Sequence, residues 1–171
     1  VNTALKLIHH EEEEIVRLLL NYGDYDIGDG MYFGMYLLTQ IEDTELKDET
    51  CIAIINAYKE AYEEGHLITP SELLKTDNST IKKLIANSLT EEQEISKNWE
   101  AKEIFIKTEI DRLSKITNDT ILRFKWRHLK YQIKEVFEKI IKATEEEEIE
   151  SLMREQMALK KREMEIGKLL G

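Results

Sequence analysis

The clearest hydrophobic pattern lies in the last third of the chain. Between residues 119 and 142, apolar residues recur at alternating four- and three-residue steps, as in a helix with one apolar seam. A second apolar stripe follows the Thr144–Glu147 pair, which has the spacing of a capping box. A very short turn separates the two patterns, so residues 119–171 are predicted to form an antiparallel helical hairpin. The first stripe is Leu122, Trp126, Leu129, Ile133, Val136 and Ile140, and the second is Ile149, Leu152, Leu159, Ile166 and Leu170.

Shorter amphipathic segments before residue 118 predict five or six short helices and no strand. The first helix should begin near His9 or His10, carry its four glutamates in the first turn, and end at Gly23. Thr69-Pro70-Ser71-Glu72 is a capping box with proline at the first helical position, a strong helix start. The other expected helices are Met31–Ile41, Glu49–Glu64 with its stop at Gly65, and two that open at Ser79 and Thr90.

The composition agrees with an all-α fold class. One Pro and seven Gly are too few for a β-sandwich or barrel, which needs a turn every few residues. We therefore predict a multi-helix bundle followed by a long C-terminal antiparallel helical hairpin. The single Cys51 cannot form an intrachain disulfide, which favours a cytoplasmic location, and no apolar run is long enough for a membrane span. The start at Val1 leads us to expect a piece of a longer protein.

Charge divides the chain near residue 118. The net charge is −11, which argues against a nucleic-acid clamp, yet residues 119–142 carry seven basic and three acidic side chains. We predict a helical bundle subdomain at 1–118, able to fold independently, and a hairpin subdomain at 119–171. The basic run around Trp126 is interpreted as the solvated face of a helix, and we expect no strong direct nucleic-acid binding. That run is Arg123, Lys125, Arg127, His128, Lys130 and Lys134.

Motifs that could carry chemistry fail on spacing. His10-Glu11 lacks the second His of a zinc-protease helix, because position 14 is Glu, and a solvated helix start is the favoured interpretation. Glu63 and His66 have di-iron spacing, but Gly65 interrupts the helix and no second copy exists. The loop 24–30 begins like a calcium loop but lacks its Gly and its final Glu, so an acidic turn is favoured. We expect no enzyme activity, no metal and no cofactor in this chain.

Three segments carry a family resemblance: Glu12–Gly23, the stretch from Ala57-Tyr58-Lys59-Glu60-Ala61-Tyr62 through Gly65 and Ile68 to Leu73, and the ending Leu159–Gly171. Together they resemble the C-terminal helicase-interaction domain of bacterial DnaG-type DNA primases, particularly the Bacteroidetes-like versions. The opening segment is also similar to the N-terminal domain of DnaB-type replicative helicases, whose fold the primase domain shares. The terminal hairpin and the Glu165–Gly171 ending favour the primase.

The resemblance implies a fold, a partner and a role. It implies a bundle of about six helices and a hairpin that docks on the N-terminal domains of the hexameric replicative helicase during primer synthesis. The primase zinc module and polymerase core would lie upstream of Val1, so this piece would bind without catalysing and be monomeric alone. Two alternatives stay open, namely the N-terminal domain of the helicase itself and a helical adaptor or scaffold that self-associates.

A methionine stripe beside the second apolar stripe has two interpretations. Met153, Met157 and Met164 are spaced to share one side of a helix, and methionine serves both as a core gap-filler and on surfaces that bind partners. Under the second interpretation, together with the resemblance, we predict a set of partner-binding residues. That set is Ile149, Met153, Met157, Lys160, Met164, Lys168 and Leu169.

Overall fold

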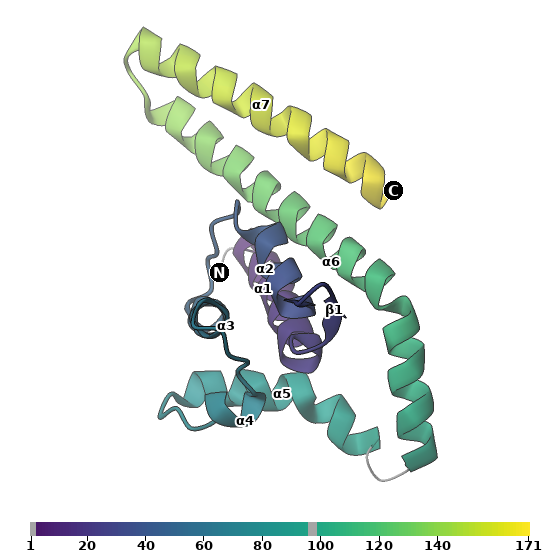
Figure 1. The fold of residues 1–171 in the computed structure, drawn as a ribbon. Helices are drawn as coiled ribbons and strands as arrows, with labels where there is room; N and C mark the ends of the chain where they lie inside the picture. Colours follow the sequence, from purple (N-terminus) through teal and green to yellow (C-terminus); the bar gives the residue numbers. More distant parts are fainter. Residues whose placement is uncertain (1–2, 96–98) are drawn as a thin grey trace.

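The computed structural model describes the backbone of residues 3–95 and 99–171, and the side chains of residues 3–89 and 113–171. Within these residues the protein is helical except for one very small sheet, which confirms the predicted all-α class. Figure 1 shows a bundle of helices from which a long hairpin extends. In chain order the elements are α1 (Thr3–Tyr22), β1 (Asp26–Gly28), β2 (Met31–Tyr32), α2 (Phe33–Ile41), α3 (Glu49–Glu63), α4 (Pro70–Leu73), α5 (Ser79–Ile95), α6 (Trp99–Lys142) and α7 (Glu146–Leu170).

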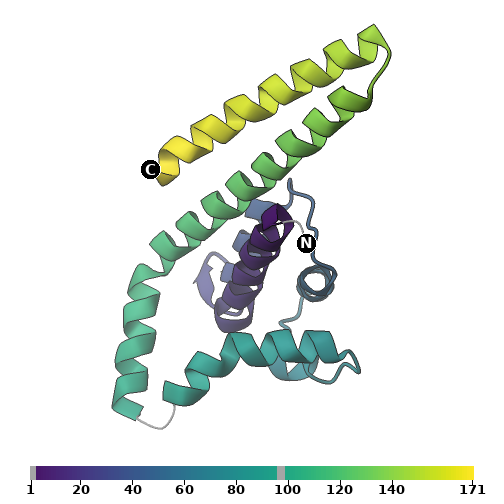
Figure 2. The same cartoon turned by 180° about the vertical axis from the view of Figure 1, so that it is seen from behind.

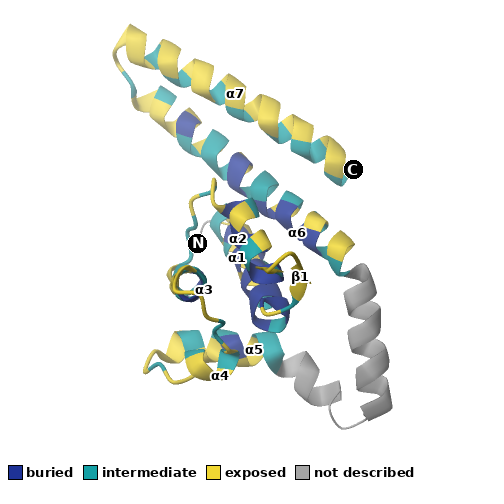
Figure 3. Cartoon of the chain, viewed as in Figure 1, coloured by how far each residue is buried: buried dark blue, intermediate teal, exposed yellow. Residues whose placement is uncertain are grey.

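Helix α1 runs through the centre of the bundle. Its residues Ile15, Val16, Leu18 and Leu19 are fully buried against α2, α3, α5 and α6. Figure 3 shows buried residues on α1, on α2 and α3 beside it, and along α6. The predicted start near His9 or His10 is wrong, because α1 already begins at Thr3. The four glutamates therefore lie in mid-helix, where Glu11 and Glu12 are buried, Glu13 is exposed and Glu14 is partly buried.

Close packing of α2 on α3 depends on Gly34. The Tyr62 hydroxyl donates to the Gly23 carbonyl oxygen at 2.8 Å, and the Gly34 N–H donates to the same oxygen at 3.1 Å. A side chain at position 34 would overlap the Tyr62 hydroxyl, so this approach requires glycine. The helix end predicted at Gly23 is confirmed, because α1 ends at Tyr22 and Gly23 is the next residue.

The capping box at Thr69 is confirmed. The Glu72 N–H donates to Thr69 Oγ1, and the Thr69 N–H donates to the Glu72 carboxylate, each at 3.3 Å. Pro70 is the first residue of α4, as predicted. The stop at Gly65 is also confirmed, because α3 ends at Glu63 and Gly65 has a φ of 77°, in the left-handed region that favours glycine.

Four local predictions are wrong. β1 and β2 form a two-stranded antiparallel sheet where no strand was predicted, and the helix expected from Met31 begins only at Phe33. Position 90 lies inside α5, so no helix opens there. At the hairpin turn the N-cap of α7 is Glu145, and its cap has no side-chain hydrogen bond, so Thr144 and Glu147 do not form a capping box.

Helix α6 joins the bundle to the hairpin without a break. It begins at Trp99, well before the predicted start at Asp119, and continues to Lys142, where a short turn leads into α7. The predicted subdomain boundary at residue 118 therefore lies inside one helix. Ile121 and Phe124, beyond that boundary, belong to the same buried cluster as the core residues of α1. Seen from behind in Figure 2, α7 runs back along α6 while α6 crosses the bundle.

Candidate protein-interaction surface

The two hairpin helices pack through the predicted stripes. On α7 every residue of the second stripe is half-buried, and α7 makes its main contacts with α6. On α6, Leu129 and Val136 are buried, and Leu122, Trp126, Ile133 and Ile140 are half-buried. The hairpin predicted from spacing is therefore present, with the predicted apolar residues at its seam.

One polar contact fixes how the two helices meet. The indole Nε1 of Trp126 donates to the Glu163 carboxylate at 2.6 Å. A Cβ at Gly167 would lie 3.3 Å from the same nitrogen, so glycine allows α7 to approach the indole closely. Because Trp126 and Gly167 lie so close together, they mark one side of the hairpin.

The Met stripe lies on the outside of α7. Met153, Met157 and Met164 are 52%, 71% and 60% exposed, far more than a residue filling a core gap. Within this chain the stripe is therefore not part of the core. The interpretation of these methionines as core gap-fillers therefore does not hold for the isolated chain.

The Met stripe faces away from the bundle. Asp43, in the loop after α2, forms ion pairs with Lys125 Nζ of α6 at 3.5 Å and with Arg162 of α7 at 3.9 Å. Arg162 therefore marks the side of α7 nearest the bundle. Met157 lies five residues before it, about 140° around the helix, on the opposite flank.

Helix α6 adds apolar residues to this outer flank. Phe137 and Ile141 are 52% and 66% exposed. Phe137 follows Trp126 by eleven residues, about three full turns, so the two share one side of α6. Since Trp126 marks the side on which Gly167 and Met164 lie, both helices contribute to one face. We call Phe137, Ile141, Met153, Met157 and Met164 the Met face.

Basic side chains border the inner end of the Met face. A shallow hollow of about 400 Å³ lies on α7 between two methionines and three lysines. Lys130 of α6 lies over the Trp126 ring, 4.1 Å from its centroid, on the same side of the hairpin. The hollow is lined by Met157, Lys160, Lys161, Met164, Glu165 and Lys168. The surface therefore combines flexible apolar side chains with positive charge, although the chain as a whole carries −11.

The predicted partner-binding residues occupy three environments. Met153, Met157, Lys160, Met164 and Lys168 are exposed on or beside the Met face. Ile149 is half-buried in the seam with α6. Leu169 is 70% exposed but lies five residues after Met164, about 140° away, on the other flank of α7. A single surface patch on the outer flank thus contains five of the seven residues.

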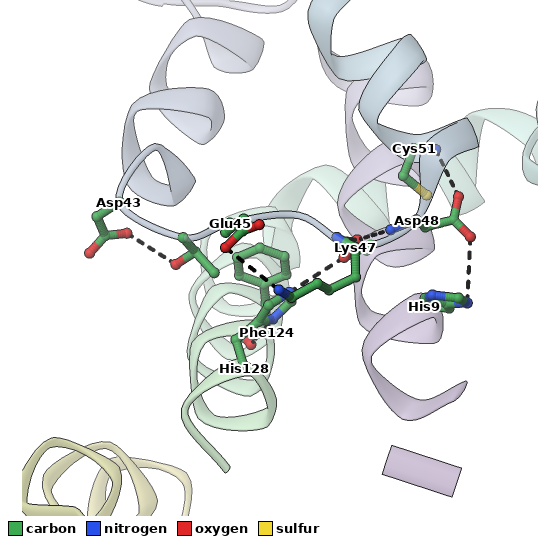
Figure 4. Close-up of polar contacts among 10 residues, drawn as sticks. His9, Asp43, Glu45, Lys47, Asp48, Cys51, Phe124 and His128 are labelled. Carbon is green, nitrogen blue, oxygen red and sulfur yellow. Dashed lines mark hydrogen bonds and ion pairs between the residues drawn. The ribbon is translucent and has the colours of Figure 1, made fainter. Parts of the chain in front are cut away.

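Sequence reasoning missed a buried polar joint between the bundle and α6. Glu12 is fully buried, and its carboxylate accepts the backbone N–H groups of Lys47 at 2.7 Å and of Asp48 at 2.8 Å. His128 of α6, only 3% exposed, places Nε2 3.4 Å from the same carboxylate, while its Nδ1 lies 2.8 Å from the Phe124 carbonyl oxygen. Figure 4 shows Lys47 and Asp48 of the 42–48 loop where this loop passes Phe124 and His128 of α6. The joint ties together α1, α6 and the loop before α3.

Internal contacts also account for much of the basic run on α6. Arg123 pairs with the buried Glu11 at 3.7 Å, Lys125 pairs with Asp43, and His128 is buried at the joint. Arg127 lies 4.8 Å from the Trp126 ring centroid. The run is thus divided among several sides of the helix, as expected for a solvated helix that also packs on a bundle.

Burial keeps the Cys51 thiol and the Tyr62 phenol of the bundle in their neutral forms. Burial, with Asp48 nearby, raises the pKa of the Cys51 thiol, which keeps it protonated and unreactive. Burial and the charge of Asp24 raise the pKa of Tyr62 to about 12.

Among the described residues no group of three or more His, Cys, Asp or Glu side chains is placed to hold a metal ion. In the same part of the chain no helix combines the length and apolar character needed to cross a bilayer.

The fold and this surface define an all-α protein in which a helical bundle carries a hairpin with an exposed apolar and basic face. The chain belongs to the family described as Domain of unknown function (DUF8430), which matches residues 2–171. No curated protein and no solved structure matches the chain.

Proposed function

We propose that this chain is a non-catalytic helicase-binding domain of a bacterial DNA primase. In this proposal the hairpin docks on the N-terminal domains of the hexameric replicative helicase and brings the primase to the fork during primer synthesis. The catalytic parts of the primase would lie in a chain segment upstream of Val1. The protein would act in the cytoplasm and be monomeric when isolated.

The exposed Met face is the observation that carries the proposal. Apolar surface costs about 25 cal/mol for each Å² left in water, and three methionines with Phe137 and Ile141 form one such surface on a thin hairpin. Methionine adapts its shape to a partner because its side chain is unbranched and flexible. A surface of this kind is therefore suited to binding another protein.

The resemblance to primases supports the identity of that partner. The similar segments lie in α1, in α3 and the region after it, and at the end of α7, so they span both the bundle and the hairpin. The implied architecture, a bundle followed by a hairpin, is the one that the chain adopts.

A calorimetric titration of this chain into the N-terminal domain of the replicative helicase from the same organism tests the proposal. Met157→Glu should weaken binding by about 1–3 kcal/mol, because it places a charge at the centre of the Met face. Removing residues 144–171 should abolish binding and leave the bundle folded, since α7 packs chiefly on α6.

Ala158→Glu is the matched control. It introduces the same side chain on the next residue of α7, which is exposed and lies on another flank, so the affinity should not change. Full affinity in both Met157→Glu and the shortened chain would show that the hairpin is not the docking surface. Primer synthesis by the purified chain, abolished by a chelator, would contradict its non-catalytic role.

The two alternatives predict different results in sedimentation and in binding. A self-associating scaffold would sediment as a dimer or larger species, and Met157→Glu would convert it to a monomer. If the chain is instead the N-terminal domain of the helicase, it should bind the C-terminal domain of the primase and fail to bind the helicase N-terminal domain in the same titration.

A further inference from the structure

The lysines that border the Met face form no ion pair with any residue that the structure describes. All of them are exposed, and three line the hollow on α7 beside a single carboxylate, that of Glu165. The chain has 35 acidic and 24 basic residues, so these lysines lack partners although carboxylates are in excess. We call them the lysine border, which consists of Lys130 and Lys134 on α6 and Lys160, Lys161 and Lys168 on α7.

The cations on the bundle side of the hairpin are paired instead. Asp43 forms ion pairs with Lys125 and Arg162, and the buried Glu11 pairs with Arg123. The charge of these three cations therefore meets a carboxylate within the chain. The charge of the lysine border remains available to a group from outside it.

The lysine border lies along the inner half of the Met face, the half nearer the bundle. Trp126 bonds to Glu163, so eleven residues further out on both helices Phe137 is level with residue 152, next to Met153. Lys134 precedes Ile141 by seven residues, about two turns, and so lies on the same side of α6. The outer half of the face is thus formed by Phe137, Ile141 and Met153, and the inner half by Met157 and Met164 among the lysines.

The form of this surface suits a third helix. The backbone N–H and C=O groups of α6 and α7 are bonded within each helix, so the hairpin offers no edge on which an added strand could pair. Two antiparallel helices side by side instead accept the apolar stripe of a third helix, as in a helical bundle. Met153 and Met164 are eleven residues apart, about 16 Å, so about three turns of a partner helix would cover the methionines.

We propose that the Met face binds an amphipathic α-helix of the partner whose apolar stripe is flanked by aspartates and glutamates. The apolar stripe covers the methionines, and the carboxylates meet the lysine border over the inner half of the face. This inference deepens the proposed function and rests on it only in taking the Met face as the docking surface. It adds the chemistry of the segment that binds there. An anionic membrane is less suited to this surface, because it would be repelled by Glu146, Glu147 and Glu148 in the first turn of α7.

The test uses three capped peptides, each made of three Ala-Leu-X-Gln-Leu-X-Gln repeats in which X is Glu, Gln or Lys. The leucines form one helical stripe in all three peptides, and only the flanking charge differs. Each peptide is titrated into the full chain labelled at its methionine methyl groups and followed by NMR. The Glu peptide should bind with a Kd of about 1 mM or below, about fivefold more tightly than the Gln peptide, and the Lys peptide should bind most weakly. This preference should shrink at high salt, which screens exposed charges.

The five methionines of the chain report where the peptide binds. The methyl signals of Met153, Met157 and Met164 should shift during the titration with the Glu peptide. Those of Met31 and Met35, which lie on the bundle in β2 and α2, should not.

Reversing two charges of the lysine border tests its role. Lys160→Glu combined with Lys168→Glu should weaken the Glu peptide by about tenfold and strengthen the Lys peptide, since both positions are exposed and the fold should not change. The matched control is Lys75→Glu combined with Lys82→Glu. These two lysines are exposed on the bundle, so the same change in net charge should alter either affinity by less than about twofold.

Several results would overturn the inference. They are equal binding of the three peptides, binding by none of them, and an unchanged affinity for the Glu peptide in the Lys160→Glu, Lys168→Glu chain. Methionine signals of the Met face that move with chain concentration alone would show that a second copy occupies it. Signals that move with vesicles of an anionic phospholipid but not with the Glu peptide would assign the face to a membrane.

The peptide titrations and the helicase titration fail separately. If the helicase domain binds but the peptides show no preference for Glu, only this inference is refuted. If the Glu peptide is preferred but the helicase domain does not bind, only the proposed function is refuted.

Discussion

Replacing Phe124 with alanine tests whether the bundle core extends beyond residue 118. Phe124 is fully buried in the cluster that contains the core of α1, and its ring centroid is 4.3 Å from that of His128. Truncating a buried Phe to Ala costs about 3–5 kcal/mol, because apolar burial is lost and a cavity remains. For a chain of this size, that corresponds to a melting temperature lower by about 6–20 °C.

Phe137→Ala is the matched control on the same helix. Phe137 is 52% exposed, so its removal should change the free energy of unfolding by less than about 1 kcal/mol. Urea unfolding of the wild type and both variants, followed by far-ultraviolet circular dichroism, gives the two differences directly. For the same reason we expect a chain that ends at Asn118 to lack cooperative unfolding, since it has lost Ile121 and Phe124.

Two results would refute this reasoning. One is a loss of less than 1 kcal/mol in Phe124→Ala, which would mean that the bundle does not depend on the second half of α6. The other is a cooperative transition in the chain that ends at Asn118. Either result would support the division into separately folding units that the charge pattern predicts.

Two further predictions concern buried polar groups. Glu12→Ala should lower the free energy of unfolding by about 3–5 kcal/mol, because the N–H groups of Lys47 and Asp48 lose their acceptor and His128 loses its partner. Urea unfolding measures this difference. Glu14→Ala, at a partly exposed position, is the control and should lower the free energy of unfolding by less than about 1 kcal/mol. The pKa of Tyr62 is raised above its ordinary value of 10 to about 12 in the folded chain, so its stabilising contribution is complete below pH 10 and is lost as the pH rises towards 12. Absorbance titration should show Tyr62 ionising late, and Tyr62→Phe should remove that late step, whereas a titration identical in Tyr62→Phe would contradict the assignment.

The features that were predictable from sequence are those that neighbouring residues determine. The Thr69–Glu72 capping box, the stop at Gly65 and the apolar seam of the hairpin each depend on residues within a few positions of one another. Such signals act through local backbone geometry and helical spacing, and the tertiary structure did not override them. The exposure of the Met stripe is also explained by helical spacing. When the second apolar stripe of α7 packs on α6, the methionines beside it are left on the outside.

The features that were missed depend on contacts between distant parts of the chain. Four consecutive glutamates are typical of a solvated first turn, yet Glu12 is buried because the 42–48 loop brings two backbone N–H groups to it. The sheet formed by β1 and β2 is too short to give an alternating pattern. The bundle-facing side of α6 was not separated from the hairpin seam, because Phe124 and His128 lie between seam residues in the sequence.

The continuity of α6 gives the hairpin the mechanical character of a lever. Phe124, anchored in the bundle, and Phe137, on the Met face, are thirteen residues apart on one helix, about 20 Å along its axis. No flexible joint lies between them, so turning the hairpin also turns the bundle. A partner bound to the Met face therefore sets the orientation of the bundle and of anything attached to it. A force applied at one end of α6 is transmitted to the other end through one continuous helix.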